Sequence, residues 1–125
     1  MLATIYLGFQ ALLYLALAVW CTLAPDGTSK ALGFDLTNGS ARSEYITVYG
    51  GLELGMAIFF LLTAVNPEWR RMGVLFALCT YACLAVFRLG TLIFVPDVGT
   101  FPKLMVGVEL TMAILAALLY LGGRE

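Results

Sequence analysis

Four long apolar runs, separated by short polar breaks, occupy most of the chain. Each run has about the 20 residues that a helix needs to cross the hydrocarbon core of a bilayer. The breaks hold proline, glycine or clustered charges, which commonly end helices or begin turns. The pattern therefore predicts four membrane-spanning helices, at about 2–23, 42–65, 67–95 and 102–121.

Only one connection between these helices is long, the segment 24–41. We expect it to be a loop whose centre, "SKALGF", forms one or two amphipathic turns at the membrane interface. The other connections are short, so consecutive helices should run antiparallel. The predicted fold class is all-α, an integral membrane antiparallel four-helix bundle. It forms a single domain over residues 1–125, with both termini on the same side.

Composition supports a bilayer location and excludes several functions. Hydrophobic residues make up 62% of the chain and charged residues 12%, with a mean hydropathy of +0.95, whereas about 25% of a soluble domain is charged. The net charge of −1 offers no basic surface to nucleic acid. Histidine is missing, and Cys21, Cys79 and Cys83 are too few and scattered for a disulfide framework or a zinc site. We therefore expect no metal, no other cofactor and no nucleic-acid partner.

The first run and the charges at the helix ends bear on location. The first run lacks the basic start of a secretory signal peptide and its apolar stretch is too long for one, so we expect a retained span. The two ends of the bundle carry equal numbers of Lys and Arg, so the positive-inside rule barely decides the orientation. The compact turn "EWRR" favours cytoplasmic termini. The charges compared are Arg70, Arg71 and Arg124 at the end with the termini, and Lys30, Arg42 and Lys103 at the other end.

Three ionisable residues lie deep inside the predicted spans: Glu53, Arg88 and Glu109. Counted at 1.5 Å per residue from the helix ends that face the segment 24–41, each lies roughly 10–12 Å below the membrane surface. Charges in hydrocarbon are costly unless they are paired, and ionisable residues there are usually functional. We therefore expect a Glu–Arg–Glu cluster in one layer of the bundle.

Tyrosines are predicted to surround this cluster. With about 100° of rotation per residue, Tyr49 falls on the helix face of Glu53, and Tyr81 falls on the face of Arg88. Tyr14, on a polar stripe of the first helix, lies close to the same depth. The interior of the bundle should therefore combine the charged cluster with tyrosines and small residues.

Two interpretations of the cluster stay open. In the first, Arg88 between two carboxylates only holds the helices in register, through charge-assisted hydrogen bonds. In the second, the cluster is a functional site, because two carboxylates around one guanidinium leave one negative charge over at low dielectric. One carboxyl group is then expected to hold a proton, which it could exchange for a cationic ligand or donate in acid–base chemistry.

Small residues recur at regular spacing in the second run. Gly51 and Gly55 form a G-x-x-x-G pattern, which commonly lets membrane helices pack closely. We interpret the pattern as ordinary packing, in which both glycines face a neighbouring helix of the bundle.

Several local sequences together resemble a known family. The first helix closes at Pro25, "LGF" follows at 32–34, "EYITVYGG" at 44–51 leads the second helix, and Arg88 and Glu109 come later. Over nearly the whole chain these features resemble small bacterial four-span membrane proteins described as a domain of unknown function, related in outline to DoxX-like proteins. The resemblance implies a compact antiparallel four-helix bundle in the bacterial cytoplasmic membrane. It implies no particular activity.

A second group of four-span proteins, the small multidrug transporters, was compared. Those proteins carry their essential glutamate in the first helix, where this chain has Gln10. A charge-paired arginine such as Arg88 is also foreign to them. Their motif therefore does not match, and their mechanism serves as an analogy only.

These observations favour a binding or accessory protein of the membrane. The polar layer would hold the headgroup of a lipid, a quinone or a similar amphiphile, with its tail between helices. The expected partners are membrane lipids, a small amphiphilic ligand, and a second copy or another membrane protein. The predicted ligand-binding residues are Glu53, Arg88, Glu109, Tyr49, Tyr81 and Tyr14.

Two alternatives remain. A proton-coupled transporter of small molecules would let proton binding to Glu53 or Glu109 compete with the substrate. A membrane enzyme, for example a lipid isomerase, would use one carboxyl group as acid and the other as base. The chain has no histidine and offers only carboxyls and tyrosines for such chemistry, so the sequence favours a protein that is not an enzyme.

Overall fold

The computed structural model describes residues 1–123, and within that range all regular structure is helical. Residue Arg124, which enters the charge comparison above, lies outside the described residues. In chain order the elements are α1 (Leu2–Leu23), α2 (Pro25–Ala31), α3 (Gly39–Ile46), the π-helical turn η1 (Thr47–Leu52), α4 (Glu53–Val65), α5 (Arg70–Phe94) and α6 (Thr100–Gly122).

Four helical stretches are long and apolar enough to cross a membrane. They are α1, the continuous stretch α3–η1–α4 over Gly39–Val65, α5 and α6. Large apolar side chains cover the outer surface, including Phe87 and Phe94, which are 77% and 83% exposed. Such a surface suits lipid rather than water. The chain is an integral membrane protein, and the predicted all-α membrane bundle is confirmed.

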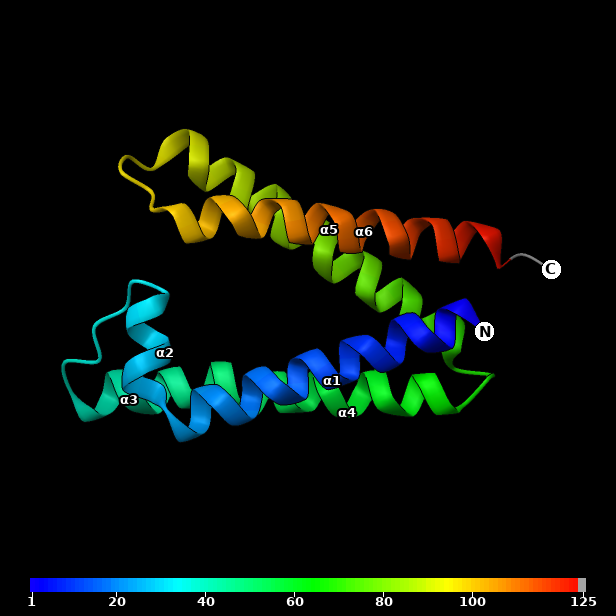
Figure 1. Cartoon of the computed structure of the whole chain (residues 1–125), viewed down its shortest axis with the longest axis horizontal. Coiled ribbons are helices and arrows are strands. Elements are labelled where there is room, and N and C mark those ends of the chain that lie inside the picture. Colours follow the sequence, from blue (N-terminus) through cyan, green and yellow to red (C-terminus); the bar gives the residue numbers. More distant parts are fainter. Residues whose placement is uncertain (124–125) are drawn as a thin grey trace.

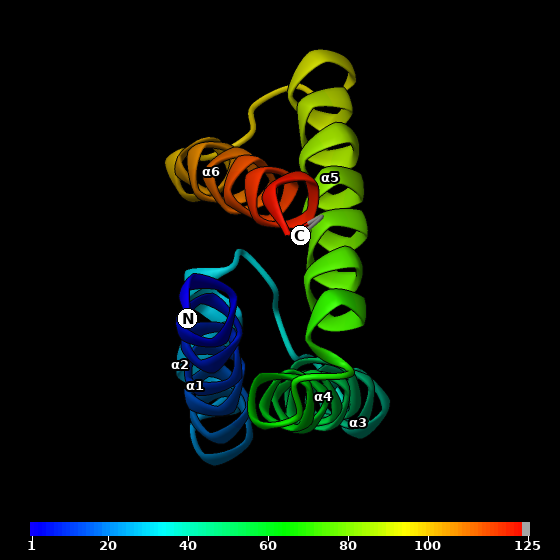
Figure 2. The same cartoon turned by 90° about the vertical axis from the view of Figure 1, so that its right-hand side faces the viewer.

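The four spans form two pairs. Helix α1 lies beside α4, and α5 lies beside α6 (Figures 1 and 2). Helix α5 starts near the end of α4 and leads away from the α1–α4 pair to α6, as Figure 2 shows. The start of α1, the α4–α5 turn and the end of α6 lie at one end of the molecule, here called the terminal end. The opposite end holds α2, α3 and the turn between α5 and α6, and is called the loop end (Figure 1).

The core is narrow and is supplied by all four spans. Leu7 of α1, Phe60 of α4, Ala77 of α5 and Ala116 of α6 are each completely buried. Tyr14 stacks on Phe60 with 5.7 Å between ring centroids. Small residues on α5 and α6 let these helices approach, while the bulky aromatic side chains come chiefly from the other pair.

The segment 24–41 is more ordered than the long loop that the sequence predicted. Pro25 opens α2, where its missing N–H group costs nothing. The second spanning stretch begins at Gly39, earlier than the predicted residue 42, because the Asn38 side chain accepts a hydrogen bond from the Ala41 backbone N–H at 2.9 Å.

The third and fourth spans also differ slightly from prediction. The third was expected from about residue 67, but α5 begins at Arg70. The Asn66 side chain accepts a hydrogen bond from the Glu68 backbone N–H at 3.0 Å, which holds the connection as a turn. The fourth span, α6, covers Thr100–Gly122 rather than 102–121.

Helix α2 ends in a left-handed turn at Gly33, the centre of the "LGF" sequence. The Gly33 N–H donates to the Lys30 carbonyl at 3.0 Å and the Phe34 N–H donates to the Ser29 carbonyl at 2.8 Å. Together with a φ of +83° at Gly33, these bonds form a Schellman motif, which strongly favours glycine at this position. The motif reverses the chain and brings Phe34 beside Tyr45 at the start of the second span.

The glycines that permit close helix packing are not the ones that the sequence indicated. A Cβ at Gly51 or Gly55 would meet nothing within 4 Å, so the prediction that this pair faces a neighbouring helix of the bundle was wrong. A Cβ at Gly50 would instead collide with the Thr22 side chain of α1. At Gly73 it would collide with the Thr63 side chain of α4. The helix contacts at these two positions require glycine.

Replacing Gly73 with alanine should destabilise the bundle by about 1–3 kcal/mol, because the Thr63 side chain has to move out of a packed contact between α4 and α5. Gly107→Ala on α6 is the matched control, since a Cβ there meets open space; alanine should be neutral or slightly stabilising. Unfolding in mixed micelles, followed by circular dichroism, measures both variants. Equal free energies of unfolding would contradict the close approach at Gly73.

Candidate functional site

An ion pair between α5 and α6 dominates the interior at the depth that the sequence indicated. The Arg88 Nε atom donates to the two carboxylate oxygens of Glu109 at 2.9 and 2.8 Å, and Arg88 Nη2 donates to Glu109 Oε1 at 2.6 Å. The Glu109 side chain is 7% exposed and that of Arg88 is 29% exposed. In a low-dielectric setting, three charge-assisted bonds neutralise both groups.

Glu53 does not share this ion pair. Within residues 1–123 the salt bridges join Arg88 to Glu109 and, at the loop end, Arg42 to Asp26. The Oε2 atom of Glu53 is buried and has no hydrogen-bond partner in this part of the chain. The expected cluster, with Arg88 between two carboxylates, is therefore corrected: one carboxylate is paired and the other is left over.

The π-helical turn η1 lies directly before Glu53. Its wider turn places one extra residue between the start of the second span and α4, and such turns often occur at functional sites. Gly50 within the turn packs against Thr22 of α1. The turn thereby fixes how Glu53 and the preceding Tyr49 are oriented relative to the rest of the helix.

Tyr14 and Tyr81 lie together in the interior, as the sequence predicted. Both are buried, at 8% and 4% exposure, and their hydroxyl groups are neighbours. Tyr14 belongs to α1 and Tyr81 to α5, so the two tyrosines meet where the two helix pairs touch.

A polar network that the sequence did not assign to the site extends from Tyr81. Its hydroxyl donates to Gln10 Oε1 at 2.5 Å, and Gln10 Nε2 donates to the Met112 sulfur at 3.3 Å. The Tyr6 hydroxyl donates to the Met112 carbonyl at 3.1 Å. Gln10 is completely buried, so this network joins α1 to α5 and α6. The sequence signal was the polar stripe at Tyr6, Gln10 and Tyr14, spaced four residues apart on one face of α1.

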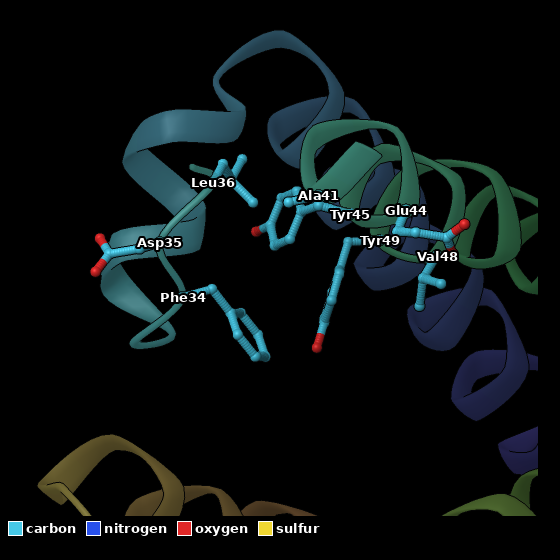
Figure 3. A pocket seen from close by; sticks show the side chains of 8 residues that line it. All are labelled: Phe34, Asp35, Leu36, Ala41, Glu44, Tyr45, Val48 and Tyr49. Carbon is cyan, nitrogen blue, oxygen red and sulfur yellow. The ribbon is translucent and has the colours of Figure 1, made fainter. Parts of the chain in front are cut away.

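Tyr49 belongs to a second feature, an aromatic group at the loop end. The rings of Phe34, Tyr45 and Tyr49 line a cavity of about 260 Å³ between the α2–α3 connection and the second span (Figure 3). Tyr49 belongs to the turn η1, which leads directly into Glu53 and α4, so it links this cavity to the start of α4.

The polar groups of the layer differ in how far they are already engaged. Among the described residues no group of three His, Cys, Asp or Glu side chains is placed to hold a metal ion. Arg88 is engaged with Glu109, so its guanidinium has limited capacity for a further anion. The group left available is one buried carboxylate oxygen on Glu53, which has no hydrogen-bond partner among residues 1–123.

Removing one member of the Arg88–Glu109 pair should leave a buried unpaired charge and cost about 3–5 kcal/mol of stability. We expect this for Arg88→Met and for Glu109→Gln in unfolding measurements in mixed micelles. The double variant should lose clearly less than the sum of the two single losses, because neither charge then remains unpaired. Strictly additive losses would contradict the ion pair.

Comparison with known proteins identifies a family and supplies no activity. The family model "Domain of unknown function (DUF4345)" matches residues 2–120. No curated protein and no solved structure matches the chain. The family match includes Arg88, Glu109, the first three spans and nearly all of the fourth, and it confirms the resemblance to a domain of unknown function. The chain therefore belongs to the DUF4345 family, a family of domains of unknown function.

Proposed function

We propose that this membrane protein binds a lipid-like or amphiphilic small molecule at the layer of Glu53, Arg88 and Glu109. The polar group of the ligand lies against Glu53 and the tyrosines Tyr14, Tyr49 and Tyr81, and its apolar tail lies between helices. The observation that carries the proposal is the buried Oε2 atom of Glu53, which has no partner among residues 1–123.

An unpartnered carboxylate oxygen inside the membrane calls for a donor. A buried acceptor without a hydrogen bond costs about 1–3 kcal/mol, and more when the group is charged. Hydrocarbon supplies no water to satisfy it. A hydroxyl, an amine or an ammonium group of a bound amphiphile would supply the missing partner. The proposed ligand therefore places a donor or a positive charge, rather than an anion, at Glu53.

Holding helices in register explains only part of this layer. Arg88 and Glu109 satisfy each other and join α5 to α6, which accounts for both of these charges. Glu53 lies on α4 in the other pair of helices and contributes nothing to that bond. If the layer served only to hold the helices in register, burying the Glu53 carboxylate oxygen without a partner would cost free energy and stabilise nothing. A ligand-binding role is therefore favoured.

We further propose that the protein lies in the bacterial cytoplasmic membrane with cytoplasmic termini. Arg70 and Arg71 stand together where α5 begins, at the terminal end, and Arg71 lies 4.7 Å from the ring centroid of Tyr120. Arginines next to a span favour the cytoplasmic side. A second copy of the chain or another membrane protein is proposed as a partner on the lipid-facing surface.

The two alternative functions give different results with the same ligand. A proton-coupled transporter would move the amphiphile or a smaller substrate across sealed vesicles in response to a pH gradient. An isomerase would return a chemically changed molecule. A binding or accessory protein would do neither and would only retain the ligand.

Glu53→Gln should weaken amphiphile binding about tenfold or more, because it removes the charge that a ligand donor would meet. Glu68→Gln, in the exposed α4–α5 turn, is the matched control and should bind as the wild-type chain does. Native mass spectrometry and thermal stabilisation in maltoside micelles, with a panel of lipids and quinones, measure both variants. Equal binding by the two variants, or no binding by the wild-type chain, would contradict the proposal.

A further inference from the structure

Three aromatic rings form a corner at the loop end of the molecule, here called the aromatic corner: Phe34, Tyr45 and Tyr49. Tyr45 and Tyr49 stack with 4.7 Å between ring centroids and make one wall. Phe34 makes the other wall, with its centroid 6.2 Å from Tyr45 and 6.0 Å from Tyr49 and its plane inclined by 67° and 52° to theirs. Figure 3 shows an opening between the rings of Phe34 and Tyr49.

Each wall is held in place by its own contacts. The left-handed turn at Gly33 and the hydrogen bond from the Phe34 N–H to Ser29 direct the Phe34 side chain back toward the second span. The Tyr45 hydroxyl donates to the Cys21 sulfur of α1 at 3.7 Å, and Tyr45 is buried. The corner is therefore built by the fold and does not depend on a ligand to assemble it.

The charged residues that line the cavity at the corner are acidic. Asp35 and Glu44 line the cavity and no Lys or Arg lines it, although both carboxylates are directed away from the rings (Figure 3). Arg42, in the neighbouring turn of α3, is paired with Asp26 at 2.6 Å. The unpaired Glu53 lies one turn beyond Tyr49. Cations are therefore favoured at the corner over anions.

We propose that the aromatic corner binds the methylated quaternary ammonium group of an amphiphile. Such a group is apolar on its surface and positively charged, so it suits aromatic faces within about 6 Å of it and acidic side chains beyond them. The cavity of about 260 Å³ is smaller than the roughly 300–1,000 Å³ of pockets that enclose whole drug-sized ligands. It therefore takes one group of a larger molecule.

This inference rests on the proposed function and names the class of its ligand. The loop end holds the ends of the spans, which we expect at the depth of lipid headgroups, and Glu53 lies about one turn further along the second span than Tyr49. A quaternary ammonium group has no N–H, so from the corner it meets Glu53 as a positive charge one turn away and not as a hydrogen-bond donor. The chain of the amphiphile can pass between the helices beside the charged layer. The alternative occupant of so apolar a cavity is an uncharged alkyl chain, which the rings would bind through apolar contact alone.

Two amphiphiles that differ in one atom test the inference. One is hexadecylphosphocholine, and the other is the 3,3-dimethylbutyl ester of hexadecyl phosphate, in which carbon replaces the ammonium nitrogen. The wild-type chain, in maltoside micelles, should bind the choline compound at least about tenfold more tightly than the carbon compound. Native mass spectrometry with both compounds measures the ratio. Equal affinities would overturn the inference, because only apolar contact would then be recognised.

Variants identify the site. Phe34→Leu and Tyr49→Leu should each reduce this preference severalfold to about tenfold, while Phe34→Tyr, which keeps an aromatic face, should retain most of it. Phe87→Leu, on the lipid-facing surface of α5 and 77% exposed, is the control. If Phe34→Leu and Phe87→Leu behave alike, the corner is not the site. If Phe34→Leu fails to fold, the comparison of the two compounds on the wild-type chain still decides.

The two proposals fail in different ways. If no lipid, quinone or choline compound binds the wild-type chain, the proposed function fails and this inference fails with it. If other amphiphiles bind and Glu53→Gln weakens them, but the ammonium nitrogen makes no difference, the proposed function stands and only the ligand class is wrong.

Discussion

Hydrocarbon offers no partner to a buried polar group, and this constraint explains the interior of the molecule. Arg88 and Glu109 satisfy each other across α5 and α6. Gln10 is completely buried. Its side-chain amide accepts a hydrogen bond from Tyr81 and donates one to the Met112 sulfur, which joins α1 to the other pair of helices. The bonds of Gln10 connect the two helix pairs, whose shared apolar core is narrow. Within residues 1–123, Glu53 Oε2 and Arg70 Nε are the buried side-chain atoms without a hydrogen-bond partner. Arg70 begins α5 at the terminal end, whereas Glu53 lies inside the second span, where we propose the binding site.

Much of the fold follows from the sequence because membrane helices are selected by length and apolarity. The four spans could be placed within a few residues, and equal depth in the bilayer was enough to bring Arg88 and Glu109 together. The separation of Glu53 could not be predicted in this way. It depends on the π-helical turn before it and on how the two helix pairs are set apart, and neither leaves a pattern in hydropathy.

Glycine shows the same limit at a smaller scale. The spacing of Gly51 and Gly55 matches a packing motif, yet the close contacts are made by Gly50 and Gly73. Spacing defines which residues share a face, but the partner helix defines which face is crowded. The sequence did not predict the role of Gln10 for a related reason. That role depends on contacts with residues of α5 and α6, which are distant in sequence.

The π-helical turn η1 changes which faces of the second span point in the same direction before and after it. An α-helix that gains one residue in a single turn is rotated by about 100° on one side relative to the other. Before η1, Tyr45 packs against Phe34 at the loop end, and Tyr49 within η1 continues this contact. After η1, α4 contributes to the core, where Phe60 is completely buried. A single insertion or deletion between residues 47 and 52 would rotate the residues before η1 relative to α4 about the helix axis. The length of this turn is therefore constrained more tightly than its side chains.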